Sequence, residues 1–168
     1  MTQPLVTVSG DFHRGVIRDR PNRFILVVEF EDGAETEVYL SNTGARNVVQ
    51  DGRTVLARRV ESTGRKTDMD ALFVETDGVW VSVDASFANT AFRSAFEERA
   101  LPYLQDYELV RAEPPLPDGG RADFELQTPD GQQAIVEVKS CSYTSAGVAK
   151  FPDRPTKRGR RHLRDLMA

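Results

Sequence analysis

Short runs of alternating hydrophobic and polar residues dominate the first half of the chain, and such alternation predicts strands with one buried face. The run at residues 23–31 is hydrophobic at its centre and alternates at its end. Asp32-Gly33 and Thr76-Asp77-Gly78 predict hairpin turns, because Gly accepts a positive φ angle. Further strands are expected at residues 35–40, 53–61, 71–75 and 79–83. About five short strands within residues 11–82 predict a sandwich or a small barrel, which periodicity alone does not separate.

The pattern changes from Asp84 onward. Phe92 and Phe96 share one stripe within residues 89–107, which predicts a helix, and Pro102 either starts a second helix or bends the first. The remaining elements are predicted to be a strand at residues 108–113, loops at 114–120 and 141–155, and a helix over 157–167 that Thr156 caps.

Residues 121–139 predict a β-hairpin around the turn Thr128-Pro129-Asp130-Gly131. Because side chains alternate along a strand, Glu137 and Lys139 share one face with Ile135. Closing the hairpin places Asp123 opposite Glu137 or one place off. Two carboxylates and one ammonium are therefore expected to converge.

Such a convergence predicts a site for a hard divalent cation, with Asp123, Glu137 and the backbone carbonyl of Val138 as ligands. Lys139 would steady a nucleophile or a developing charge, so Asp123, Glu137 and Lys139 are the predicted catalytic residues. The opposing interpretation is a weak ion pair on a solvated strand face. The arrangement Asp…Glu-x-Lys resembles the signature of the PD-(D/E)xK nuclease-like superfamily.

Glu97 and Glu98 on the preceding helix are candidates to complete the metal shell through water, and the alternative is a solvated helix face. With one Cys and two His in the chain, a Cys/His zinc site is not expected. Any metal is therefore expected on carboxylates, which favours Mg²⁺ or Mn²⁺. The single Cys141 cannot form an internal disulfide, which fits a reducing cytoplasm.

The length of 168 residues supports one domain or two small ones, and a hydrophobic fraction of 39% is sufficient for a core. No apolar run approaches the length of a membrane span, and residues 1–10 lack the features of a signal peptide. A cytoplasmic protein without a membrane partner is expected.

The net charge of −4 argues mildly against nucleic-acid binding, but basic residues gather in two stretches of the chain. A locally basic surface on an acidic protein can still bind phosphates. The alternative is that these side chains lie on solvated faces. The residues predicted to contact DNA phosphates are Arg20, Arg23, Lys157, Arg158, Arg160, Arg161 and Arg164.

Several separated stretches, in order and in register from about residue 14 to the C-terminus, resemble the sugar fermentation stimulation protein A (SfsA) family. The matching stretches are Arg20-Pro21-Asn22-Arg23-Phe24, Ser41-Asn42-Thr43-Gly44-Ala45, Ala88-Asn89, Arg121-Ala122-Asp123-Phe124, Ile135-Val136-Glu137-Val138-Lys139-Ser140, Phe151-Pro152-Asp153, Thr156, Arg158-Gly159 and His162-Leu163. Two residues depart from the family pattern: Ser41 replaces a Pro, and Thr90 stands where an Arg usually follows the Asn.

The resemblance implies an α/β chain, α+β overall, in which an OB-like β-barrel domain (residues 1–83) precedes a restriction-endonuclease-like α/β domain (84–168). It also places Asp123, Glu137 and Lys139 on the presumed nuclease triad and Arg23 in a phosphate contact, while Asn42 and Thr43 are expected to shape a loop. Family members typically continue beyond the position of Ala168. The second domain is thus expected to be a C-terminally shortened fragment or to be completed by a partner, such as a second copy in a homodimer.

Three functions are compatible with these observations. The first is a DNA-binding protein of the sugar fermentation stimulation type, with mainly sequence-independent phosphate contacts and a Mg²⁺-dependent nuclease site. The second is a catalytically silent nuclease fold that acts only as a DNA-binding regulator of sugar metabolism genes. The third is an OB module for a partner that is not a nucleic acid.

Overall fold

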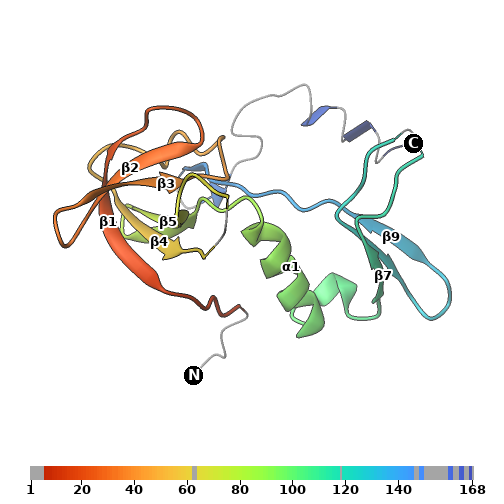
Figure 1. The fold of residues 1–168 in the computed structure, drawn as a ribbon. Helices are drawn as coiled ribbons and strands as arrows, with labels where there is room; N and C mark the ends of the chain where they lie inside the picture. Colours follow the sequence, from red (N-terminus) through yellow and green to blue (C-terminus); the bar gives the residue numbers. More distant parts are fainter. Residues whose placement is uncertain are drawn as a thin grey trace. The chain divides into compact units, whose positions relative to one another are not determined.

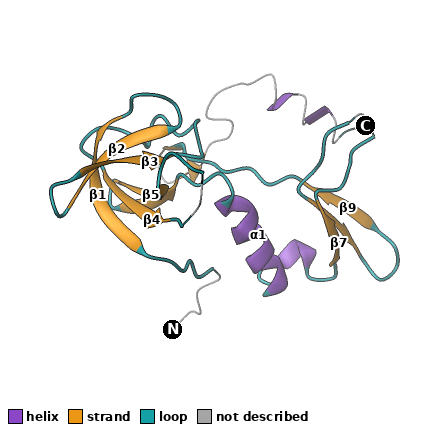
Figure 2. Ribbon diagram, in the orientation of Figure 1, coloured by secondary structure: helices purple, strands orange, loops and turns teal. Residues whose placement is uncertain are grey.

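The computed structural model describes residues 6–61, 64–117, 119–145, 148–149, 159–160, 163–164 and 167 (Figure 1). The chain divides into two compact units. One contains Val8–Phe87 together with the segment that begins at Cys141, and the other contains Ala88–Ser140. Strands outnumber helices in the described part of the chain (Figure 2), and no helix there is long and apolar enough to cross a membrane.

The first unit is a closed barrel of five strands with OB-like topology, and a sixth strand extends its sheet. Its sheet has the order β3-β2-β1-β4-β5-β6, and a parallel pairing of Tyr39 with Asp70 joins β3 to β5 and closes the barrel. This closure excludes the sandwich alternative and confirms the small barrel. The strands are β1 (Phe12–Asp19), β2 (Ile25–Phe30), β3 (Glu35–Tyr39), β4 (Thr54–Arg59), β5 (Met69–Thr76) and β6 (Val79–Ser82).

The hydrophobic side chains of the alternating pattern fill the interior of the barrel, because every second residue of a strand points inward. Leu26 and Val28 on β2 and Val38 on β3 are fully buried. The strand β1 was not among the predicted runs, although it pairs with both β2 and β4. Its Gly15 permits close packing, since a Cβ atom there would lie 2.5 Å from Val28 Cγ1.

Both predicted hairpin turns of the barrel are confirmed. Gly33 between β2 and β3 has a φ angle of 77°, and the Asp32 carboxylate accepts the amide of Ala34 at 3.0 Å. Asp77 and Gly78 between β5 and β6 have φ angles of 52° and 77°. Successive positive φ angles match the turn to the twist of the strands that it joins.

The second unit combines a three-stranded antiparallel sheet with an α-helix and a short 3-10 helix. Its elements are α1 (Phe87–Glu97), the 3-10 helix η1 (Pro102–Leu104), β7 (Glu108–Ala112), β8 (Phe124–Gln127) and β9 (Gln133–Val136), with the sheet order β7-β8-β9. Phe96 from α1 packs with Phe124 and Leu126 from β8, and this cluster shares no residue with the core of the barrel. The predicted hairpin is confirmed, and Pro102 starts a separate 3-10 turn rather than bending α1.

The prediction of a loop over residues 141–155 is wrong in part. Thr144–Ser145 and Val148–Ala149 form the short antiparallel pair β10 and β11 in the barrel unit. The Asn47 side chain donates to the carbonyl of Ser142 at 3.2 Å and ties the segment to the barrel. Within the helix predicted over 157–167, residues 159–160 and 163–164 are helical, and Thr156 lies outside the described residues.

Candidate active site

Asp123 lies where the ladder between β8 and β9 ends. The last registered pair is Phe124↔Val136, and the amide of Asp123 also donates to the carbonyl of Val136 at 3.0 Å. On the other side, the carbonyl of Asp123 accepts the amide of Glu113 at 2.9 Å. Hydrogen bonds on two sides thus fix the main chain of Asp123, and one of them joins it to Val136, the residue before Glu137.

Beyond the end of the backbone ladder, the carboxylate of Asp123 accepts two further hydrogen bonds. Its Oδ2 accepts the amide of Val138 at 2.7 Å, and its Oδ1 accepts Nδ2 of Asn89 at 2.8 Å. Asn89 lies in the first turn of α1, so helix and hairpin together orient the carboxylate. Each oxygen retains a second lone pair, because a carboxylate can accept about four hydrogen bonds.

Glu137 and Lys139 follow the end of β9 and form an ion pair. The side chain of Glu137 is 10% exposed and that of Lys139 is 36% exposed. Val136 and Val138, which flank Glu137 in the chain, pack against the Phe96–Phe124–Leu126 cluster. Alternation around these two valines therefore keeps Glu137 and Lys139 away from the core.

A third carboxylate of the hairpin, Glu125, forms an ion pair with the side chain of Arg111. Nε of Arg111 on β7 lies 2.6 Å from the Glu125 carboxylate, whose side chain is 13% exposed. Arg111 and Glu125 are also partners in the register of the sheet. Their charges balance each other across β7 and β8.

The two glutamates at the end of α1 are exposed, and α1 itself ends at Glu97. Glu97 pairs with Arg93 at 3.1 Å, one turn earlier, and Glu98 is exposed. Among the residues that the structure describes, no group of three or more His, Cys, Asp or Glu side chains could hold a metal ion. Glu97 and Glu98 are therefore not gathered with Asp123 and Glu137, and a role for them through water stays a prediction.

The predicted phosphate-binding arginines of the barrel differ in their surroundings. Nη2 of Arg20 donates to the carbonyls of Arg23 and Thr43, each at 3.2 Å. Burial lowers the pKa of Arg20, and the nearby guanidinium of Arg46 lowers it further. The guanidinium of Arg23 instead stacks over the ring of Phe24, with its Cζ 4.5 Å from the ring centroid. Arg20 thus helps to hold the loop together.

The structure describes only some of the predicted C-terminal basic residues. Arg160 and Arg164 are helical and exposed. Lys157, Arg158 and Arg161 lie outside the described residues. The assignment of all these side chains to DNA phosphates stays a prediction.

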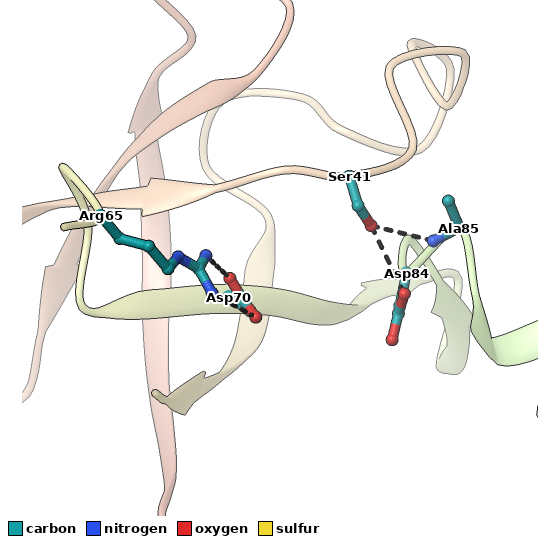
Figure 3. Close-up of polar contacts among 5 residues, drawn as sticks. All are labelled: Ser41, Arg65, Asp70, Asp84 and Ala85. Carbon is teal, nitrogen blue, oxygen red and sulfur yellow. Dashed lines mark hydrogen bonds and ion pairs between the residues drawn. The ribbon is translucent and has the colours of Figure 1, made fainter. Parts of the chain in front are cut away.

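The loop that begins at Ser41 has a structural role. Oγ of Ser41 accepts the amide of Ala85 at 2.9 Å and donates to the carboxylate of Asp84 at 3.4 Å (Figure 3). Oδ1 of Asn42 accepts the amide of Gly44 at 3.1 Å, which closes a local turn. The expectation that Asn42 shapes this loop is confirmed.

Two residues in these surroundings were not predicted as functional. Asn89 holds the carboxylate of Asp123, and its only signal in the sequence was its place in the Ala88-Asn89 stretch at the start of a helix. Arg46 lines a hollow of about 400 Å³ together with Arg20, Asn22 and Arg23. Nothing in the spacing of the sequence indicates that Arg46 joins that group, because it lies on a different loop.

Comparisons with known proteins agree with this architecture over both units. The profile of the family described as "SfsA N-terminal OB domain" matches residues 19–83, and that of the "Sugar fermentation stimulation protein RE domain" matches residues 86–168. A sugar fermentation stimulation protein homolog from Clostridium kluyveri is 32% identical over 161 residues, which cover 93% of this chain and 69% of that protein. A homolog from Caldanaerobacter subterraneus is 34% identical over 162 residues, with coverages of 95% and 69%.

A solved structure shows the same fold. It is titled as SfsA from Pyrococcus furiosus in complex with Ca²⁺, is 27% identical in sequence, and superposes with a TM-score of 0.85 over 99% of this chain and 70% of that one. Both domain profiles, the curated homologs and this structure agree. The chain therefore belongs to the sugar fermentation stimulation protein (SfsA) family.

Proposed function

We propose that the chain binds DNA and that its second unit hydrolyses phosphodiester bonds with Mg²⁺ or Mn²⁺ at Asp123, Glu137 and Lys139. The observation that carries the proposal is the carboxylate of Asp123, which Asn89 and Val138 orient at the end of the hairpin that carries Glu137 and Lys139. The related protein from Pyrococcus furiosus, whose structure is titled as a complex with Ca²⁺, supports a site for a hard cation in this fold.

The residues present fit such a cation. Mg²⁺ is usually held by one or two carboxylates, keeps several waters and takes its remaining ligands from substrate phosphates. Asp123 and Glu137 supply two carboxylates, and the carbonyl of Val138 is a proposed third oxygen ligand. All three donors are hard oxygen atoms, which favour Mg²⁺ or Mn²⁺ over zinc.

The side chains of the hairpin have distinct parts in the proposed reaction. A bound divalent cation lowers the pKa of water and stabilises the charge that develops on a phosphate. Asn89 and the Val138 amide hold the Asp123 carboxylate in one orientation, which reduces the cost of organising the site. Lys139 lies beside Glu137 and can orient a water molecule or offset the added negative charge.

DNA binding in this proposal rests on phosphate contacts from arginine and lysine. Such contacts release counterions, so affinity should fall steeply with salt and depend little on sequence. Arg23, Arg46, Arg160 and Arg164 are exposed cations of the described part of the chain. The proposed ligand is therefore DNA without a preferred sequence.

The test is incubation of the purified protein with labelled single-stranded and duplex DNA in Mg²⁺, Mn²⁺ or EDTA. We expect cleavage with either metal and none in EDTA. The Lys139→Ala variant should lose cleavage and keep its DNA affinity in a mobility-shift assay, because the ammonium acts on the reacting groups. Arg93→Ala, which removes a positive charge from α1, should cleave like the wild type.

The outcomes separate the alternatives. Wild-type cleavage by Lys139→Ala would contradict the role of the lysine. A mobility shift without metal-dependent cleavage would make the chain a DNA-binding protein with a silent nuclease fold. The absence of both binding and cleavage would refute the proposal.

Asn89→Ala tests the positioning of Asp123. Loss of a partner that orients a metal ligand typically costs about 10- to 100-fold in metal affinity or activity. We expect the variant to need about 10-fold more Mg²⁺ for half-maximal cleavage and to bind Mn²⁺ more weakly in calorimetry, with little change in rate at saturating metal. Arg93→Ala on the same helix is the control. An unchanged metal dependence would show that Asn89 has only a structural role.

A further inference from the structure

The strand β7 contains a β-bulge that decides which of its side chains point away from the core of the second unit. Leu109 pairs with Leu126 and packs on that core, and the next registered pair is Arg111↔Glu125. Val110 is therefore the extra residue of the bulge. In a regular strand the residue at position 110 would lie opposite Glu125, and alternation would turn Arg111 toward the core. The bulge instead places Arg111 beside Glu125, and bulges next to active sites often re-aim a side chain in this way.

The carboxylates of the candidate site lie on the same face of the sheet as Arg111. Glu125 and Ile135 are register partners on β8 and β9, and they alternate with residues that pack in the core. Asp123 precedes Glu125 by two residues. Glu137 likewise follows Ile135 by two residues. Two residues of a strand span about 7 Å, so the ion pair of Arg111 lies one strand repeat from the candidate site. We call the face that carries these five side chains the outer face.

The guanidinium of Arg111 is fixed at one nitrogen and open at the others. Its Nε donates to Oε2 of Glu125 at 2.6 Å. The side chain of Arg111 is 55% exposed, whereas that of Glu125 is 13% exposed. Within the described part of the chain, neither terminal nitrogen of Arg111 has a hydrogen-bond partner. The N–H groups of such a planar fork bind phosphate oxygens in pairs.

Apolar side chains accompany this guanidinium. Val110, beside Arg111 in β7, is 51% exposed, and Ile135, the register partner of Glu125, is 45% exposed. A DNA strand alternates charged phosphates with less polar sugars, so a phosphate at Arg111 would bring a sugar close to these side chains. A small inorganic anion would use the guanidinium alone. The outer face therefore suits a nucleic-acid backbone better than an isolated anion.

The alternative is that Arg111 only joins β7 to β8. Exposed ion pairs contribute little to stability, because solvent screens them. Arg121 and Glu113 form such a pair, with side chains that are 67% and 71% exposed. The pair of Arg111 differs from it, since its carboxylate is largely buried and holds the guanidinium in one place on the outer face. This fixed orientation favours a role in binding.

We propose that Arg111 binds the phosphate next to the scissile phosphate of the DNA strand and that Glu125 positions its guanidinium. The inference rests on the proposed function and names a substrate contact of the same site. The scissile phosphate would lie at Asp123 and Glu137, and its neighbour would lie one strand repeat away at Arg111. Contacts to two adjacent phosphates fix the direction of the strand across the site, which lowers the entropic cost of reaching the reactive geometry.

The test is digestion, in Mg²⁺, of a labelled duplex that carries a single uncharged methylphosphonate, with a gel that resolves cleavage at every bond. In the wild type, the bond on one side of the methylphosphonate should be cleaved about 10- to 100-fold more slowly than the same bond in unmodified DNA, the effect of losing a hydrogen bond to a charged group. Arg111→Ala should cleave unmodified DNA more slowly by a similar factor and show no difference between the two substrates. An ion pair that only joined two strands would not create this dependence on one phosphate.

Further variants separate charge, geometry and positioning. Arg111→Lys keeps the charge without the planar fork and should show a smaller difference between the substrates. Glu125→Ala should lose most of the difference, whereas Glu125→Gln, whose amide oxygen can accept the bond from Nε, should keep it. Arg93→Ala, which removes the exposed cation of α1, should behave like the wild type. All of these variants should need the wild-type concentration of Mg²⁺ for half-maximal cleavage, because none removes a proposed metal ligand.

An equal difference between the substrates for the wild type and for Arg111→Ala, with circular dichroism showing a folded variant, would overturn the inference. A wild-type difference in Glu125→Ala would refute the positioning role of Glu125. If unmodified DNA is cleaved and no bond beside the methylphosphonate is slowed, only this inference fails. If the wild type cleaves no DNA, the proposed function fails and this inference fails with it.

Discussion

Asp123→Asn is expected to abolish metal-dependent cleavage. Both oxygens of the Asp123 carboxylate accept a hydrogen bond, one from Asn89 and one from the Val138 amide. An asparagine would turn an NH₂ group toward one of these donors and would also lose the negative charge. The loss of activity should exceed the about 10- to 100-fold that removal of an outer partner costs, and binding of Mn²⁺ measured by calorimetry should disappear.

The matched control for this variant is Glu108→Gln, which removes a carboxylate from an exposed position on β7 of the same sheet. It should cleave and bind Mn²⁺ like the wild type. Circular dichroism and DNA affinity at low salt establish whether Asp123→Asn is folded. Cleavage by folded Asp123→Asn at the wild-type rate would remove Asp123 from the site.

Leu126→Ala is expected to destabilise the second unit selectively. Leu126 is fully buried and packs with Phe96 and Phe124. Truncation of a buried leucine to alanine costs about 2–5 kcal/mol of unfolding free energy, depending on how far the cavity collapses. Because this cluster shares no residue with the barrel core, hydrogen exchange should accelerate in β7, β8 and β9 and stay unchanged in β1 to β5.

The reciprocal variant is Leu26→Ala, since Leu26 is fully buried in the core of the barrel. It should accelerate exchange in the barrel strands and leave β7 to β9 protected. Equal acceleration in both units for either variant would show that the two cores unfold in one cooperative transition. Metal-dependent cleavage at the proposed site, which β8 and β9 support, should then respond to both substitutions alike.

Local sequence chemistry is sufficient to predict the elements that carry the candidate site. The turn Thr128-Pro129-Asp130-Gly131 and the alternation on either side of it specify the hairpin of β8 and β9, and thus bring Asp123 within one place of Glu137. The turns at Gly33 and Gly78 can likewise be predicted from the sequence, because few other residues accept their positive φ angles. These features depend on interactions between residues that are close in sequence.

The strand β1, in contrast, could not be predicted from local sequence patterns. Its run contains Arg14, Gly15 and Arg18, which weaken the hydrophobic signal, yet it lies between β2 and β4 in the closed sheet. Gly15 is explained by the packing of β2 against it, because a Cβ atom there would lie 2.5 Å from Val28 Cγ1, 2.8 Å from the carbonyl oxygen of Glu29 and 2.9 Å from Phe30 Cδ1. The need for a glycine at such a position arises from a neighbouring strand, so the pattern within its own strand cannot predict it.

The sequence alone therefore determines most of the strands, the hairpins and the placement of Asp123, Glu137 and Lys139 on one hairpin, because turn chemistry and a period of two act over a few residues. Only the tertiary structure decides the closure of the barrel at Tyr39 and Asp70, the bond from Asn89 to Asp123 and the grouping of Arg46 with Arg20. These contacts join residues far apart in the chain. Their formation depends on the packing of whole elements, which buries enough apolar surface to offset the entropy of ordering them.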